Sequence, residues 1–178
     1  MVRIEGRGLS ELNGNMVKYV CKFSDEDCWN GDEAPGSGDS LYIPPGLNLV
    51  IDVDSVPDMT DAEPDDLPYL TAVVVEGSLI FEPDANETHN RTFAANYIIV
   101  REGSIEIGTE DRPYTSNLEI VLYGNKTDPQ LPLFGNKVIG VWEGSLDIHG
   151  KPRSQTWSTM NATVNANQTE ITVNMKAS

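Results

Sequence analysis

Apolar and polar positions alternate in short runs along most of this chain, which is the pattern of β-strands. The runs are bounded by Gly, Pro, Asn and Asp. No window of a dozen residues repeats its apolar positions at the three- and four-residue spacing of an amphipathic helix. The pattern therefore predicts an all-β protein, with strands over residues 16–22, 40–43, 48–53, 71–75, 79–81, 97–101, 105–107, 118–123, 137–142, 146–148 and 170–174.

One phrase, Glu-Gly-Ser followed by Leu or Ile, occurs three times, at 76–79, 102–105 and 143–146. Each copy follows a continuously apolar run and precedes an alternating one, as in TAVVV-EG-SLIF. Gly at such a point permits a positive φ or a close backbone approach, so the phrase predicts a corner between two strands. The three glycines are separated by 26 and then 41 residues, which indicates one structural step reused with loops of different length.

The segment PPGLNLVID at 44–52 is a degenerate copy of the same step. Strand, Gly corner, strand and loop together describe one coil of a parallel β-helix. We therefore predict a short right-handed parallel β-helix of about four coils, with corners at Gly46, Gly77, Gly103 and Gly144. An antiparallel β-sandwich that uses these glycines in hairpin turns is the alternative.

Charge excludes several classes of partner. The 178 residues suit one domain, and 12 Lys and Arg against 28 Asp and Glu give a net charge of −16. Such a surface repels nucleic acid and anionic lipid. The most apolar stretch, 70–75, is far shorter than the roughly 20 residues that span a bilayer, so we expect no direct membrane insertion by this chain. The start, MVRIEGRGL, lacks the apolar core of a signal peptide, so a secreted form would derive from a longer precursor.

Two features favour an extracellular compartment. The chain has only two cysteines, Cys21 and Cys28, whose spacing predicts a small disulfide loop; a metal-binding pair is the rival interpretation. Five Asn-x-Ser/Thr sequons predict N-glycosylation at Asn86, Asn90, Asn125, Asn161 and Asn167.

Candidate catalytic chemistry is sparse. His89 and His149 stand alone in sequence, and the Gly-rich stretch 31–38 lacks the Lys and helix of a phosphate-binding loop. Glu76, Glu102 and Glu143 recur one coil apart. Because stacked like charges about 4.8 Å apart would repel each other, we expect these glutamates to face solvent.

Three tryptophans could stack on a sugar ring, although we expect Trp142 to be a core residue and Trp29 to pack beside Cys28; Trp157 is the third.

An acidic loop follows the first corner. Asp52, Asp54, Asp58 and Asp61 occupy the first, third, seventh and tenth positions of a partial EF-hand-like run that lacks Gly at the sixth. A solvated loop is the preferred interpretation, with weak calcium binding by these four residues as the alternative. We expect no other metal or cofactor.

The motifs together resemble the eight-glycine domain. The resemblance is carried by Trp29, PGSGDSLYIPPG (35–46), the three Glu-Gly-Ser phrases, LYGNK (122–126), GNKVIGVWEGSLDIHGKP (135–152) and Trp157. This domain is found in fibrocystin, the fibrocystin-like protein and hyaluronan-degrading proteins. It implies a division into 1–28, a cap or joint to an immunoglobulin-like module; 29–153, the domain itself; and 154–178, the start of a longer β-helix.

The resemblance implies a non-catalytic module of a large single-pass, receptor-like protein, at the extracellular face of the membrane or secreted. The fibrocystin setting implies cilia or other membrane protrusions. Expected partners are neighbouring domains of the parent chain and an unknown extracellular protein or glycan. The alternative is a fragment of a hyaluronan-binding or hyaluronan-depolymerising protein, an enzyme whose candidate residues here would be Arg101, Asp52 and Asp54.

Overall fold

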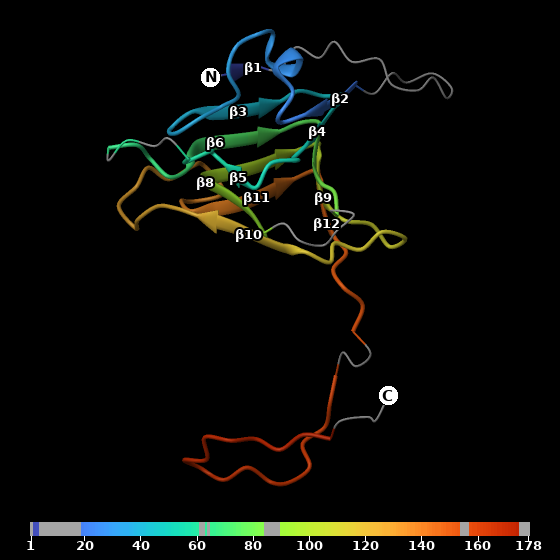
Figure 1. Cartoon of the computed structure of the whole chain (residues 1–178). Coiled ribbons are helices and arrows are strands. Elements are labelled where there is room, and N and C mark those ends of the chain that lie inside the picture. The colour runs from blue at the N-terminus through green and yellow to red at the C-terminus, as the bar shows by residue number, and fades with distance from the viewer. Residues whose placement is uncertain are drawn as a thin grey trace.

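The computed structural model describes residues 2–3, 19–60, 63, 65–83, 90–153 and 157–174. Within them the protein is all-β apart from one short 3-10 helix, η1 (Glu26–Trp29), and its strands form two sheets (Figure 1). The first sheet, here sheet A, contains β1 (Val2–Arg3), β3 (Ser40–Ile43), β5 (Ser55–Val56), β6 (Leu70–Val75), β8 (Asn90–Arg101), β10 (Asn117–Leu122) and β11 (Val138–Trp142). Sheet B contains β2 (Tyr19–Lys22), β4 (Leu47–Val50), β7 (Ser78–Phe81), β9 (Ser104–Ile107) and β12 (Ser145–Ile148).

Every pairing between these strands is parallel, so the chain forms a β-solenoid and not a sandwich. A strand of sheet A, a corner and a strand of sheet B make one rung. The four rungs are β3–β4, β6–β7, β8–β9 and β11–β12, joined by about three turns of the chain. The predicted parallel solenoid is confirmed, and the antiparallel alternative is wrong.

The core lies between the two sheets and consists of columns of aligned apolar side chains. In sheet B, Leu49, Leu79 and Ile105 are opposite one another on successive rungs and are almost completely buried. The next member of that column, Leu146 on β12, is 41% exposed. Each rung is therefore buried by the rungs on both sides of it, and the fourth rung has described neighbours on one side only.

The unequal spacing of the repeated phrase has a simple structural cause. β8 is a continuous strand of twelve residues, whereas its neighbour on the fourth rung is divided into β10 and β11. The register places residues 123–137 opposite the single residue Asn96. On the other side of β8, residues 57–69 stand opposite Ala94, between β5 and β6. Loops thus leave the rungs in mid-strand without shifting the stacking of the corners.

The corners use glycine for two different reasons. At Gly103 an added Cβ would lie 2.5 Å from the carbonyl oxygen of Gly77 on the preceding rung, so only a residue without a side chain fits there. Gly46 has open space around it but adopts a φ of +81°, in the left-handed region. In the third and fourth rungs the left-handed residue is the Glu before the glycine, at Glu102 and Glu143.

Some predicted boundaries differ from the structure. β8 begins at Asn90 and not at residue 97, because its first half pairs with β10 and β5. The predicted strand at 170–174 is not formed; that segment makes only an isolated antiparallel bridge between Met160 and Val173. The start of the predicted strand 16–22 lies outside the described residues.

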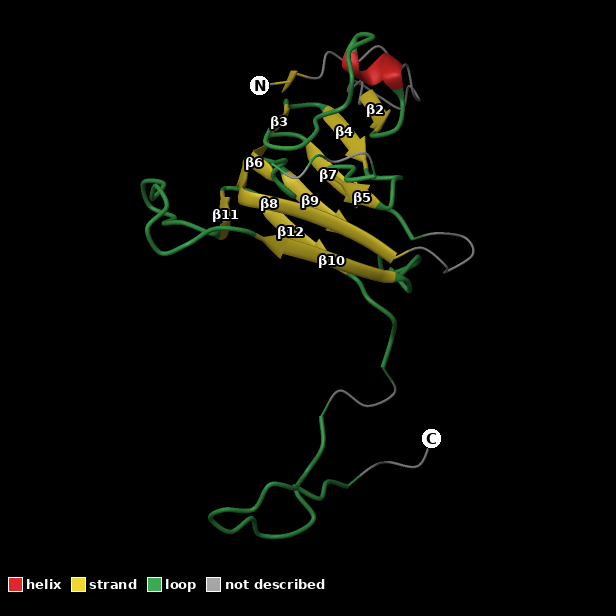
Figure 2. Ribbon diagram, turned by 60° about the vertical axis from the view of Figure 1, so that its left-hand side comes forward, coloured by secondary structure: helices red, strands yellow, loops and turns green. Residues whose placement is uncertain are grey.

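Residues 157–174 lie apart from the solenoid, as both views show (Figure 2). No helix among the described residues is long and apolar enough to cross a membrane.

Candidate functional site

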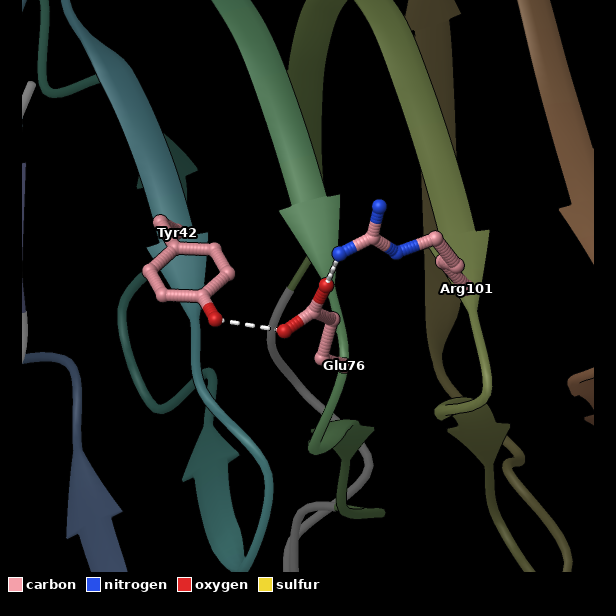
Figure 3. A network of polar contacts seen from close by, with 3 residues as sticks. All are labelled: Tyr42, Glu76 and Arg101. Carbon is pink, nitrogen blue, oxygen red and sulfur yellow. Dashed lines mark hydrogen bonds and ion pairs between the residues drawn. The ribbon is translucent and has the colours of Figure 1, made fainter.

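A polar network joins three successive rungs on the outer face of sheet A (Figure 3). Tyr42 lies in β3, Glu76 directly follows β6, and Arg101 ends β8. Because Val75 stands opposite Val100, the residues after them come side by side. The Tyr42 hydroxyl donates to Glu76 Oε2 at 2.5 Å, and Arg101 Nη2 donates to Glu76 Oε1. One carboxylate therefore ties the first, second and third rungs together.

The environment of Glu76 keeps this carboxylate charged. The hydrogen bond from Tyr42, followed by that from Arg101, holds the pKa of Glu76 below its ordinary value. Its side chain is 12% exposed, against 60% for Arg101. The expectation that all three corner glutamates face solvent is therefore wrong for Glu76, whereas Glu102 and Glu143 are exposed. A carboxylate held ionised in this way suits a structural clamp better than a general acid.

A second candidate site is a cavity of about 400 Å³ beside η1. Apolar residues line its base: Phe23, Trp29, Ala34 and Val53. The Trp29 ring packs edge-on against Phe23, with centroids 5.3 Å apart, and its Nε1 donates to the Phe23 carbonyl oxygen at 2.9 Å. The indole is thus fixed, and its only donor is already used.

Carboxylates surround the opening of this cavity, at Glu26, Asp32, Glu33 and Asp58, all of them exposed. The hydroxyl and backbone N–H of Thr60 donate to Asp58 Oδ1 at 2.6 and 2.9 Å, and these bonds lower the Asp58 pKa. No Lys or Arg is among the described residues that line the cavity. The site is apolar at its base and negative at its rim.

The cysteine pair belongs to the same end of the solenoid. Cys21 in β2 and Cys28 in η1 are both buried, and they contact each other as free thiols. Burial, with a further contribution from Cys28, raises the pKa of Cys21 to about 12. Such a thiol is a poor nucleophile, so Cys21 is unsuited to thiol catalysis. Disulfide formation stays a prediction.

Two of the four acidic residues considered as calcium ligands, Asp52 and Asp58, have separate hydrogen-bond partners. Asp52 accepts from the backbone N–H and hydroxyl of Ser24, at 3.0 and 2.6 Å. Asp58 bonds Thr60, Asp54 is exposed, and Asp61 lies outside the described residues. In the part of the chain that the structure describes, no three His, Cys, Asp or Glu side chains are placed to hold one metal ion. Calcium binding stays a prediction.

Four of the five sequon asparagines are exposed: Asn90, Asn125, Asn161 and Asn167. Asn86 lies outside the described residues. Asn90, at the start of β8, accepts a hydrogen bond from Asn117 Nδ2 at 2.9 Å. Glycosylation stays a prediction at each of them.

The residues considered for hyaluronan chemistry are engaged separately. Arg101 pairs with Glu76, and Asp52 bonds Ser24. The expectation that Trp142 is a core residue is wrong: it is 49% exposed, because it stands opposite the exposed Arg101 on the outer face of sheet A.

Two other aromatic candidates and the histidines complete the set. Trp29 is buried beside Cys28 as expected, and Trp157 is exposed. His149 is exposed at the end of β12, and its backbone bonds Ile107 and Tyr114. His89 lies outside the described residues.

Sequence reasoning missed Tyr42 as a partner of Glu76, and it missed the cavity. The first is a diagonal contact: the register places Tyr42 opposite Val74, two residues before Glu76, so alignment of the corners alone does not identify it. The second had no sequence signal, because its lining comes from two segments, 23–34 and 53–58, that only the fold brings together.

The comparisons with known proteins agree on one family. The model of the G8 domain matches residues 28–161. Fibrocystin-L of Mus musculus is 31% identical over 173 residues, 97% of this chain and 4% of that protein. Fibrocystin of Canis lupus familiaris is 23% identical over 94% of this chain and 4% of its own length. A cell surface hyaluronidase of Danio rerio is 29% identical over 55% of this chain and 7% of its own length.

No solved structure matches the chain significantly. The chain spans about 4% of the length of its fibrocystin relatives, so it corresponds to a small part of proteins of that kind. The match of the G8 model over most of the solenoid, together with the relatives, confirms the resemblance seen in the sequence motifs: this chain belongs to the G8 (eight-glycine) domain family.

Proposed function

We propose that this G8 domain is a non-catalytic extracellular module of a large cell-surface, receptor-like protein, in which it holds neighbouring parts of the polypeptide in a fixed relation. Membership of the G8 family and the likeness to the fibrocystins support an extracellular module. The exposed sequon asparagines and the acidic surface suit the same setting.

The uncovered fourth rung is the observation that carries the structural part of the proposal. Val141, Leu146 and Ile148 on β11 and β12 are 40, 41 and 59% exposed. They stand in register with Val100, Ile105 and Ile107 of the third rung, all of which are buried. Among the described residues, β12 pairs only with β9. A free strand edge beside apolar side chains favours addition of another strand. We propose that a further part of the longer polypeptide stacks on this rung.

Site-specific photo-crosslinking in the longest natural polypeptide that contains this domain, expressed at a cell surface, tests the proposal. A benzophenone amino acid at Ile148 is expected to crosslink within the same polypeptide, as mapped by mass spectrometry. The same probe at the exposed Lys126 serves as the control and is expected to give far fewer such links. Crosslinks from position 148 only to other proteins, or none at all, would reject the structural role.

The hyaluronidase relative favours a second candidate function. That protein matches 103 residues of this chain, and its name records activity on hyaluronan. Incubation of this chain with long hyaluronan, with and without calcium, followed by sizing of the polymer, decides the matter. We expect no change in size; depolymerisation would replace the non-catalytic proposal.

A further inference from the structure

We infer that the cavity beside η1 is a docking site for a basic side chain, Lys or Arg, presented by a partner protein. The cavity is separate from the fourth rung, and the inference does not depend on the proposed linking function. Three properties of the cavity support it: size, apolar base and charged rim.

The size suits one long side chain with its neighbouring backbone. A volume of about 400 Å³ falls within the range of sites that bind small ligands. The residues at the opening, including Gly31, Asp32 and Glu33, are exposed, so a protruding segment of another protein can reach it.

The base suits the aliphatic part of a Lys or Arg side chain. Phe23, Trp29, Ala34 and Val53 offer apolar surface against which methylene groups pack while the charged end remains near the opening. The Trp29 N–H is already donated to Phe23, so the indole offers no donor to an anionic ligand.

The rim selects a positive charge. Glu26, Asp32 and Glu33 make no side-chain hydrogen bond or ion pair with any other described residue, so their carboxylates are available to a ligand. The fourth rim carboxylate, Asp58, is bonded to Thr60 and stays ionised. The net charge of −16 adds long-range attraction for a basic partner.

The same carboxylates do not converge as metal ligands would. No described group of three His, Cys, Asp or Glu side chains is placed to hold one ion. Carboxylates spread around an opening match an extended guanidinium or ammonium group with several donors better than they match a compact divalent cation.

Peptide binding to the 178-residue chain tests the inference. The probe is a fluorescent peptide of alternating Gly and Arg, and a Gly–Ser peptide of equal length is the uncharged comparison. Affinity is measured by fluorescence anisotropy, and the indole N–H signal of Trp29 is followed by NMR. Trp142→Phe and Trp157→Phe assign that signal, since both of these residues are exposed. The Gly–Arg peptide is expected to bind and to shift the Trp29 signal. The Gly–Ser peptide is expected to leave that signal unchanged.

Paired variants separate the cavity from general attraction. Asp32→Asn with Glu33→Gln is expected to weaken binding about fivefold, because two available rim charges are lost. Glu110→Gln with Asp111→Asn removes the same charge from the exposed loop after β9 and is expected to change affinity by less than about twofold. Ala34→Phe fills the base without altering charge and is expected to abolish the Trp29 shift, with the melting temperature measured in parallel.

Several results would overturn the inference. If both double variants weaken peptide binding equally, the peptide is held only by the general negative charge of the chain. An unchanged Trp29 signal at saturation would place binding elsewhere. A Trp29 shift produced by calcium and not by the peptide would assign the cavity to a metal ion.

Discussion

At the β2 end of the solenoid, η1 and the residues around it cover the interior, whereas at the β12 end the last rung leaves its apolar side chains in contact with solvent. Trp29 and Cys28 are buried to within a few per cent at the first end. Leu146 and Ile148 are about half exposed at the other, although SLDI repeats the phrase that is buried as SLIF and SIEI. The same local sequence is thus core or surface according to whether another layer covers it.

The largest effect should come from a side chain at an inner corner. Gly103→Val should destabilise the fold by about 3 kcal/mol or more, because its Cβ would meet the carbonyl oxygen of Gly77 at 2.5 Å. A Cβ at position 144 would lie 2.6 Å from the carbonyl oxygen of Gly103. Because the fourth rung can shift outward, Gly144→Val is expected to lower the free energy of unfolding by only about 1 kcal/mol. Urea unfolding measures both.

Gly36→Val is the matched control for these corners, because nothing lies within 4 Å of its Cβ position. Equal losses at positions 36, 103 and 144 would show that the corners impose no steric limit.

Truncation of matched core positions compares covered and uncovered rungs directly. Leu79→Ala should lower the free energy of unfolding by about 3 kcal/mol, because Leu79 is 1% exposed between two rungs. Leu146→Ala, in the same column, should cost less than about 1 kcal/mol. The two midpoints in urea provide the measurement, and similar losses would mean that the fourth rung is covered in solution.

The covered end should depend on its cysteines. If Cys21 and Cys28 are oxidised in secreted protein, the small loop they close should contribute about 2 kcal/mol, which reductant removes. Intact mass without reductant should be lower by two hydrogens. A Cys21→Ser/Cys28→Ser variant cannot form the disulfide. Its free energy of unfolding is expected to be no higher than that of the reduced parent, and lower by whatever it costs to place two hydroxyl groups in the core. Retention of both thiols in secreted protein would reject the bond.

The smallest effect concerns the clamp between rungs. Because the pKa of Glu76 is depressed in the folded state, its contribution to stability is full above the unfolded pKa and is lost as pH falls through the folded one. Stability of the parent relative to Glu76→Gln should therefore be greatest near neutral pH and shrink below about pH 4.

Glu143→Gln, at the exposed corresponding corner, is the control for this pH series. A constant difference between parent and Glu76→Gln from pH 7 to pH 3 would show that the clamp does not depend on the charge of Glu76.

Most of the fold could be read from the repeated phrase, because a corner between stacked strands demands a small residue and an alternating strand after it. The loop that divides the fourth rung could not be predicted from the sequence. Residues 123–137 show no pattern that identifies Asn96 as the single residue opposite them. Less of the candidate site could be predicted from the sequence. Arg101 and Glu76 were noted there, but their contact depends on the parallel register of the strands. The cavity depends on long-range packing of Phe23, Trp29 and Val53.

The sequence by itself determined that this chain is all-β, acidic, built on a glycine-cornered repeat and related to the G8 domain, because these properties are written in composition and local pattern. Only the tertiary structure decided which copies of the repeat are buried and that Glu76 is covered while Glu143 is not. It also decided where an apolar cavity meets a ring of carboxylates. The physical reason is that burial and charge pairing belong to contacts between rungs, and those contacts join residues 25 or more positions apart in the chain.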